Sequence, residues 1–289
     1  MLNSDRVKIL KTYKIFVDGK FPRTESGRYF IFKSNQGEDI ANICNCSRKD
    51  FRDAVTAARS AWAKWSKATH SNRGQILYRI AEMLEGRREQ FISELQQQGS
   101  TAALAQAEVN LSIDRLVYYA GWADKYQQVF STVNPVASSH FNFSVLESTG
   151  VVTIVAPEES ALLGLVSVIA PAIVGGNSVV VLASSGKPLS AVTFAEVLNT
   201  SDVPAGVVNI LTGYRKELLS HFSSHMDVNA IVYCGNSQEE LKTVENNAAL
   251  NIKRVVHWSD LDWEKDEAQG PYQILDLQEV KTTWHPIGI

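Results

Sequence analysis

The stretch GVVTIVAPEESALLGLVSVIAPAIVGGNSVVVLA, residues 150–183, decides the fold of this chain. Its pattern predicts a buried strand over 150–156, a buried helix over 161–174 that Gly-Gly-Asn ends, and a second buried strand over 177–183. Strands that are apolar along their whole length, with a helix between them, are typical of a parallel sheet covered on both faces. We therefore expect an α/β fold.

The same alternation of strands and helices continues toward the carboxyl end. This order predicts a doubly wound parallel sheet, and such sheets bind ligands outside the carboxyl ends of their strands. The further predicted elements are a helix over 188–200, a strand over 206–213, a helix over 215–225, a strand over 230–235 and a helix over 237–250.

Other patterns flank this α/β region. Strand-like pieces occupy 14–43, and a long zone of helical periodicity follows over 48–126. Residues 128–148 alternate apolar and polar side chains around a turn, which predicts a β-hairpin. After an acidic, turn-rich linker over 259–271, the tail 272–289 alternates again, like a strand with a free edge.

Composition indicates a soluble globular protein. The 289 residues are 45% hydrophobic with a net charge of −3 and no basic stripe, so a nucleic-acid binder is not expected. Residues 160–186 carry no charge, but Pro171 and the Gly-Gly-Asn divide them into pieces too short for a bilayer of about 30 Å. Three cysteines and a charged, non-apolar amino terminus favour a reducing compartment, and we expect a cytoplasmic protein without a membrane segment.

Several motifs resemble the aldehyde dehydrogenase superfamily, and the resemblance covers nearly the whole chain. The matching stretches are YYAGWADK (118–125), APAIVGGNSVVV (170–181), VPAGVVNILTG (203–213), AVTAARSAWAKW (54–65) and FVDGKF (16–21). The resemblance implies a Rossmann-like cofactor domain with a doubly wound parallel sheet, an N-terminal helical region and a small β oligomerisation element.

The resemblance also implies how the chain divides into domains. Residues 1–127 and 149–258 correspond to the cofactor domain, and residues 128–148 and 272–289 to the oligomerisation hairpin and terminal strand. The acidic linker 259–271 stands where the family places its catalytic domain. We expect the catalytic domain, and with it the cysteine nucleophile, to be missing, as in the truncated second copy found in some long members of the family.

In the family, the turn after the first buried strand contains a proline, an aromatic residue and then an asparagine, and the amide of that asparagine donates a hydrogen bond to the oxyanion. This chain has Pro157, Glu158 and Glu159 there. An ionised Glu159 has no proton to donate, and at ~4 Å with an effective dielectric near 20 it would repel an oxyanion by about 4 kcal/mol. The two glutamates mark either a working site or a lost one. We favour helix caps in a lost site, since a carboxylate in the first turn stabilises a helix by about 0.3–1 kcal/mol.

The position of the family's general base, a glutamate, corresponds to Trp258 in the segment 255–259. An indole cannot accept a proton from water. His257 could do so, but a single histidine at the end of a strand is usually structural. Cys234 ends the YCGN strand, where the family has a small residue, and we do not expect it to replace the nucleophile.

The cofactor-binding positions implied by the resemblance are also altered. Ala183 stands in place of the ribose-binding lysine, and residues 184–186 contain no carboxylate. Gly235 is retained where the backbone approaches the diphosphate, but Glu240 replaces the second glycine, and an acid there competes with phosphate at a helix N-terminus. The vestigial cofactor positions are Pro157, Ala183, Gly213, Gly235, Asn236 and Glu240.

Two short patterns could suggest a metal. Cys44 and Cys46 lack a second pair of ligands, and His221 and His225, four residues apart on a predicted helix, lack an acid at ligand spacing. We expect no metal at either place.

These losses predict a non-catalytic protein that acts as a structural or regulatory partner of a full-length aldehyde dehydrogenase. The contacts are expected through strand 279–284 and hairpin 128–148, by addition of a strand to another chain. No cofactor is expected, although NAD or NADP could bind weakly in the crevice. The alternatives are an NAD(P)-binding module, a component active only in a complex, and a homodimer through residues 237–250.

Overall fold

The computed structural model describes Val7 and residues 9–288. The parts of the predicted segments that fall on residues 1–6, 8 and 289 lie outside the described residues. Within the described chain, no helix is both long enough and apolar enough to cross a membrane.

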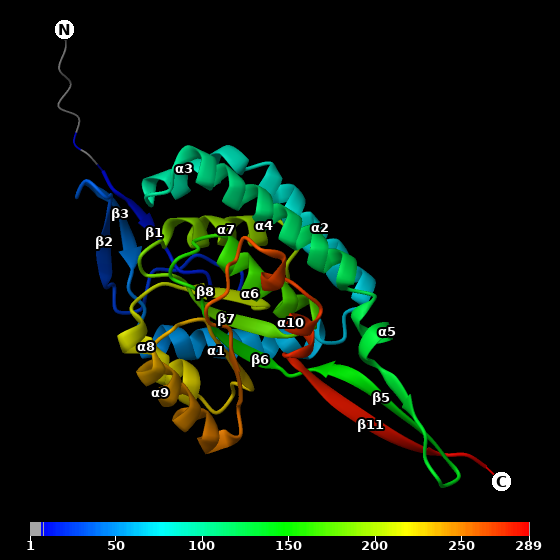
Figure 1. The fold of residues 1–289 in the computed structure, drawn as a ribbon. Helices are drawn as coiled ribbons and strands as arrows, with labels where there is room; N and C mark the ends of the chain where they lie inside the picture. Colours follow the sequence, from blue (N-terminus) through cyan, green and yellow to red (C-terminus); the bar gives the residue numbers. More distant parts are fainter. Residues whose placement is uncertain (1–6, 8, 289) are drawn as a thin grey trace.

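A five-stranded parallel sheet forms the centre of the molecule, as predicted (Figure 1). All five strands pair in parallel in the order β10-β9-β6-β7-β8, so the chain starts at the middle strand, winds outward to one side and then returns to the other. The strands are β6 (Val151–Val155), β7 (Ser178–Leu182), β8 (Val208–Leu211), β9 (Ala230–Tyr233) and β10 (Arg254–His257).

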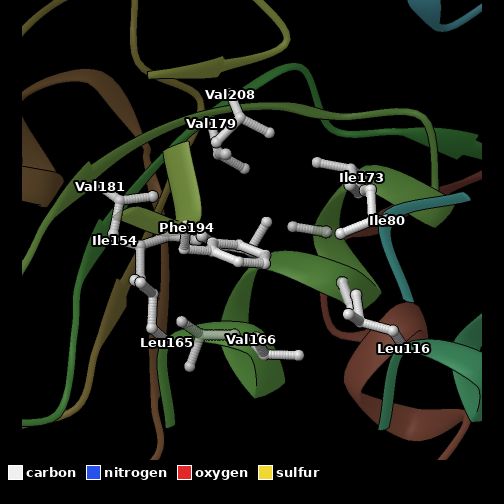
Figure 2. Close-up of a cluster of buried hydrophobic side chains, with 14 of the residues drawn as sticks. Ile80, Leu116, Ile154, Leu165, Val166, Ile173, Val179, Val181, Phe194 and Val208 are labelled. Carbon is white, nitrogen blue, oxygen red and sulfur yellow. The ribbon is translucent and has the colours of Figure 1, made fainter. Parts of the chain in front are cut away.

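Helices cover both faces of this sheet, which makes it doubly wound. One face packs on α6 and α7, and Phe194 of α7 lies among the apolar side chains of β6, β7 and β8 (Figure 2). The other face packs on α1, α8 and α9 in a second apolar cluster. The bounds are α1 (Arg48–Trp65), α6 (Leu163–Val174), α7 (Leu189–Asn199), α8 (Arg215–Ser224) and α9 (Gln238–Ala248).

Three more helices form an outer layer over α6 and α7, and a small sheet lies at the amino-terminal end of the described chain (Figure 1). In that sheet β3 is central, parallel to β1 and antiparallel to β2. These elements are α2 (His70–Glu85), α3 (Arg88–Gln97), α4 (Ala102–Trp122), β1 (Lys11–Tyr13), β2 (Tyr29–Lys33) and β3 (Asp39–Cys44).

A long antiparallel ribbon projects from this body, with the carboxyl end of the chain at its tip (Figure 1). Its sheet has the order β11-β5-β4, with β4 (Thr132–Asn134), β5 (His140–Ser148) and β11 (Gln278–Pro286). The hairpin predicted over 128–148 is present but begins later than expected, because the chain is helical through α5 (Tyr126–Phe130). The predicted tail strand likewise starts only after a short helix, α10 (Tyr272–Leu275).

The linker 259–271 is packed against the body. It contains one short 3-10 turn, η2 (Asp266–Ala268), and the side chain of Trp263 is buried. Arg115 of α4, itself buried, donates hydrogen bonds to the carbonyl oxygens of Trp263 (3.0 Å) and Ala268 (2.9 Å) and to Ser167 Oγ of α6 (2.7 Å). Burial lowers the pKa of Arg115, but no ordinary pH deprotonates an arginine. One guanidinium thus fixes the linker to two helices.

We expect Arg115→Met to lower the free energy of unfolding by about 3 kcal/mol, because it leaves two carbonyl groups and one hydroxyl group without their buried donor. Urea denaturation followed by circular dichroism measures this loss, and limited proteolysis should cut the linker faster. Arg79→Met, which changes an arginine on the exposed side of α2, is the matched control and should cost no more than about 0.5 kcal/mol. Equal losses in the two variants would show that Arg115 does not hold the linker.

Candidate functional site: the carboxyl edge of the central sheet

The candidate site lies where the five parallel strands end. The chain order reverses between β6 and β9, and a sheet of this kind holds its ligand in the crevice at such a reversal. The sequence-predicted site residues follow these strand ends, so the fold brings most of them to one edge. This edge contains Pro157 to Glu159 after β6, Ala183 to Lys187 after β7, Gly213 after β8, Gly235 and Asn236 after β9, and His257 and Trp258 at β10.

The carboxylate of Glu158 occupies the loop that follows β7. Its Oε2 accepts hydrogen bonds from Ser184 Oγ (2.7 Å) and from the backbone amides of Ser185 (3.0 Å) and Gly186 (3.2 Å). Consecutive backbone amides of this kind form an anion-binding concavity. The resemblance implies that this loop binds the ribose of the cofactor. In this structure its hydrogen-bond donors bind the carboxylate of Glu158 instead.

Arg215, the first residue of α8, connects Glu158 to the rest of the edge. Its Nε lies 3.2 Å from Glu158 Oε1, and its Nη2 donates to the carbonyl oxygen of Ala156 at 2.6 Å. Nη1 lies 3.8 Å from Glu240 Oε2 at the start of α9. The side chain is only 16% exposed, so these contacts are partly shielded from water and stronger than a surface ion pair.

The space above Gly235 is filled by protein. A Cβ added to Gly235 would collide with the phenol ring of Tyr233 and lie 2.7 Å from Arg215 Nη1. The Tyr233 hydroxyl donates to Glu240 Oε2 at 2.6 Å, and burial, followed by that hydrogen bond, raises the pKa of Tyr233 well above its usual range. Tyr233, Arg215 and Glu240 therefore occupy the place that the resemblance gives to a diphosphate.

The interpretation of Glu158 and Glu159 as helix caps is wrong. Helix α6 starts only at Leu163, and the backbone amides of Leu162 and Leu163 donate to Glu108 Oε1 of α4, at 2.8 and 3.2 Å. Ser160 Oγ also accepts from the amide of Gly164 at 2.8 Å. A carboxylate and a hydroxyl from elsewhere satisfy the free amides, so the two glutamates are available for other contacts.

The same correction applies in part to Glu240. It lies in the first turn of α9, as predicted, but the cap of that turn is the side chain of Ser237, whose Oγ accepts a hydrogen bond from the backbone amide of Glu240. The carboxylate of Glu240 turns to Tyr233 and Arg215 instead.

Glu159, at the position that the resemblance gives to the oxyanion donor, binds the linker. Its Oε1 accepts a hydrogen bond from Trp263 Nε1 at 3.1 Å, and its carbonyl oxygen accepts one from Lys187 Nζ at 2.5 Å. A pocket of about 330 Å³ opens beside it, with Glu108 and Leu104 among its other lining residues. Four acidic residues, Glu108, Glu159, Asp262 and Glu264, line this pocket against one lysine, Lys187, so the net negative charge disfavours an oxyanion here.

Trp258 and His257 also have structural contacts. Trp258 Nε1 donates to Asp276 Oδ2 at 3.2 Å, beyond the linker. His257 stacks on Tyr233 with ring centroids 5.5 Å apart, and its Nε2 lies 2.9 Å from the carbonyl oxygen of Gly235. The imidazole helps to hold the Tyr233 ring over Gly235.

Four more sequence-predicted cofactor positions, Pro157, Ala183, Gly213 and Asn236, remain to be placed in the structure. Ala183 is buried, and Pro157 packs against Gly164 of α6. Gly213 has a positive φ of 151° and lies against Asn45, where a Cβ would come within 3.0 Å of Oδ1. Asn236 is exposed beside the crevice.

Neither the cysteines nor the histidine pair form a reactive or metal-binding cluster. Cys44, Cys46 and Cys234 are free and buried, and burial raises the pKa of the Cys234 thiol well above its usual range, which disfavours the nucleophilic thiolate. In the described part of the chain, no group of three or more His, Cys, Asp or Glu residues is placed to hold a metal ion. Burial lowers the pKa values of His221 and His225, and Arg48 lowers both further.

Sequence reasoning missed Arg215, Tyr233 and Glu108, which determine the geometry of this edge. One signal was available: Arg215 begins the helix four residues after β8, and acids follow neighbouring strands of the same parallel sheet, whose carboxyl ends all share one edge. The contacts of Glu108 span more than 50 residues and have no local signal.

A model of the aldehyde dehydrogenase family matches residues 22–257, most of the chain. The chain belongs to the aldehyde dehydrogenase family. The resemblance and the fold expected from it are confirmed.

Relatives in the aldehyde dehydrogenase family match at about one third identity. Aldehyde dehydrogenase, cytosolic 1, from Elephantulus edwardii is 31% identical over 256 residues, which cover 86% of this chain and 50% of that protein. Cytosolic 10-formyltetrahydrofolate dehydrogenase from Xenopus laevis is 31% identical over 260 residues, 88% of this chain and 29% of that protein. A solved aldehyde dehydrogenase from Bacillus cereus superposes with a TM-score of 0.81 at 25% identity, covering 86% of this chain and 51% of that one. The chain spans about half the length of most of these relatives.

The crevice does not fit the nicotinamide cofactor that such a fold implies. Ala183 offers no polar group to a ribose, Glu158 already occupies the amides of residues 185 and 186, and Tyr233 and Arg215 fill the space over Gly235. A dinucleotide could enter only if these side chains moved and if the phosphates were placed beside two carboxylates.

We expect Glu158→Ala to expose an anion site in this crevice. The change leaves the amides of Ser185 and Gly186 without their acceptor and the Arg215 guanidinium with Glu240 as its one remaining carboxylate among those described above, and should lower the free energy of unfolding by about 1–2 kcal/mol. Added sulfate should then raise the melting temperature of the variant more than that of the unmodified protein. Glu239→Ala, an exposed glutamate on the same helix as Glu240, is the control and should respond to sulfate as the unmodified protein does. A Glu158→Ala response no larger than that control would contradict the role of Glu158.

Stability should fall as the pH falls below the usual histidine range. Because burial lowers the folded-state pKa values of His221 and His225 below their ordinary 6.5, the unfolded chain binds protons first as the pH drops. The stability is therefore present above about pH 6.5 and is lost progressively toward the lower folded-state values. Urea denaturation over this range should give a flatter profile for the double variant His221→Gln, His225→Gln than for His285→Gln, which alters an exposed histidine on β11. Parallel profiles would show that the pair does not carry the effect.

Proposed function

We propose that this member of the aldehyde dehydrogenase family is non-catalytic and acts as a structural or regulatory partner of a full-length aldehyde dehydrogenase. Strand β11 and the β4–β5 hairpin provide the contact, by adding an antiparallel strand or a sheet to the second chain. The observation that carries the proposal is the free edge of β11, at the end of a ribbon that leaves the body of the protein.

Contacts along β11 support this role. Within the described part of the chain, β11 pairs only with β5, in a register that runs from Gln278–Ser148 to Pro286–His140. From Val280 onward every described side chain is exposed, including Trp284. A long unpaired edge with exposed apolar side chains is a strong template for another strand, so it requires a partner or some protection.

The chemistry of the crevice supports the non-catalytic part. Thiolate attack on an aldehyde needs an ionised cysteine and donors aimed at the oxyanion. The cysteine nucleophile that the resemblance implies has no counterpart here, because Cys234 lies where the family has a small residue and its thiol is buried. Glu159 places an acceptor at the position of the oxyanion donor, and Trp258 places an indole at the position of the general base. Neither of these two groups can perform the step that the resemblance assigns to its position.

The folded linker supports a chain that functions without a catalytic domain between β10 and β11. Buried Trp263 and the hydrogen bonds from Arg115 fill the surface of α4 and α6 with residues of the linker itself. These contacts are specific, because the carbonyl oxygens of Trp263 and Ala268 satisfy a buried guanidinium. An unstructured connection left by the loss of a domain would not be expected to make them.

A second surface supports assembly with a related chain. Leu250 is 72% exposed at the end of α9, and Ile252 is 96% exposed with a positive φ of 54°, a strained conformation for a β-branched residue. Exposed apolar side chains held in a strained turn favour a buried position in a complex. This turn includes the last residue of 237–250, the segment through which a homodimer is the alternative.

The test is co-purification of the tagged full chain with a full-length aldehyde dehydrogenase expressed from the same cell. Removal of residues 280–289 should abolish the association while leaving the melting temperature within a few degrees, because the buried Leu277 and Gln278 stay in place. Val280→Lys, which puts a charge beside the strand edge, should weaken association at least tenfold, whereas Val117→Lys on α4 should not. Unchanged association without residues 280–289 would rule out the strand contact.

The same preparation tests the non-catalytic part independently. Titration of the isolated chain with NAD or NADP should give no saturable heat and no thermal shift, whereas a ligand at a hundred times its dissociation constant would stabilise the protein by about 2.7 kcal/mol. Reduction of NAD with an aldehyde by the isolated chain, or micromolar cofactor binding, would overturn this part and favour an NAD(P)-binding module or a shared active site.

A further inference from the structure

A second pocket lies at the root of the projecting ribbon, away from the crevice. Its volume is about 340 Å³, and it lies between the end of α1, the first turns of α2 and the body end of β5. The lining residues that matter here are Trp62, Lys67, His70, Arg73, Tyr126 and Leu146.

Arg73 lies in this pocket wall as a buried cation without an anion. Its side chain is only 3% exposed, and its one hydrogen bond among the described residues runs from Nη2 to the Tyr126 hydroxyl at 3.3 Å. The buried Nε has no partner at all in the described chain. Leaving a buried charge without an ion partner costs several kcal/mol, so a guanidinium in this state favours an incoming anion strongly.

Arg115, the other buried arginine described above, has the hydrogen-bond acceptors that Arg73 lacks within the described chain. Arg115 is equally buried, but its hydrogen bonds reach two carbonyl oxygens and one hydroxyl. At Arg73, the neighbouring Gly176 backbone is so close to Nη1 that a Cβ there would collide with it. The chain thus keeps room for this guanidinium without supplying an acid to neutralise it.

The other charged groups around the pocket do not neutralise the positive charge of Arg73. Lys67 is exposed at the rim, and the pKa of His70 is lowered by burial first and by the charge of Arg73 second, more than Asp124 raises it. The carboxylate of Glu147 also lines the pocket but is paired with Lys281 at 3.5 Å. The field in the pocket is therefore positive.

We propose that this pocket binds a small organic carboxylate. The planar fork of a guanidinium matches a carboxylate group, and Lys67 and His70 add a second cation and a donor at the rim. The ring of Trp62 and the side chain of Leu146 give an apolar wall for a short carbon chain. The volume of about 340 Å³ lies at the lower end of the range for small-molecule pockets and readily admits a short carboxylate.

The position of the pocket connects such a ligand to the ribbon. Ser148 of β5 accepts a hydrogen bond from Trp62 Nε1 at 2.9 Å, and Gln127 Nε2 donates to the carbonyl oxygen of Leu146 at 2.7 Å. A ligand held between Arg73 and Leu146 would tie the base of β5 to the body. This site does not depend on the proposed partner or on the crevice.

The test titrates the full chain with acetate, butyrate and inorganic phosphate at fixed ionic strength, followed by thermal shift and calorimetry. We expect saturable stabilisation by acetate or butyrate at concentrations up to tens of millimolar. Lys67→Glu should weaken this binding about tenfold, because it puts a negative charge at the rim. Lys64→Glu makes the same charge change on α1 outside the pocket lining and should leave the affinity unchanged.

Arg73→Lys keeps the positive charge but removes the planar guanidinium, and should weaken carboxylate binding more than Lys67→Glu does. If the Arg73→Lys variant does not fold, the comparison of Lys67→Glu with Lys64→Glu decides whether the ligand binds in this pocket. Stabilisation by phosphate alone would overturn the carboxylate assignment. Equal affinities in the Lys67→Glu and Lys64→Glu variants would overturn the location, and absence of saturable binding by any of the three probes would overturn the site.

Discussion

Arg215 holds together the edge of the sheet at which this fold family places its ligand. One guanidinium at the start of α8 binds the carbonyl oxygen of Ala156 and the carboxylate of Glu158 and lies near that of Glu240, so three strand ends and two helix starts converge on it. Carboxylates so close to one another repel unless a cation lies between them. The two acids and the arginine are therefore one unit, and the tyrosine over Gly235 is held by its hydrogen bond to the same unit.

This arrangement differs from a site that has merely lost its functional groups. A crevice from which groups had been deleted would be open and would retain amides able to bind phosphate. Here Glu158 uses two of those amides, Tyr233 fills the space above Gly235, and Glu159 fastens the linker through Trp263. In this structure these groups make contacts within the chain, which explains how the fold accommodates acids at this edge.

The sequence predicted the sheet, its flanking helices and the projecting strands, because apolar periodicity and the order of elements determine them locally. It also predicted which residues would gather at the carboxyl edge. It could not predict what Glu158 and Glu159 do there, because their partners Ser185 and Trp263 lie 27 and 104 residues away and depend on side-chain packing. The helix-cap interpretation failed for the same reason: Glu108, 54 residues before Leu162, had already satisfied those amides.

The filled space above Gly235 changes what that glycine means. A Cβ at this position would collide with the Tyr233 hydroxyl and lie 2.7 Å from Arg215 Nη1, so any larger residue would force these side chains to move, whether or not a nucleotide ever approaches it. Selection for packing alone would preserve the residue that a pattern search counts as evidence of dinucleotide binding. The packing of Tyr233 and Arg215 is thus a sufficient reason for glycine at this position, and the glycine alone does not indicate that the chain binds a dinucleotide.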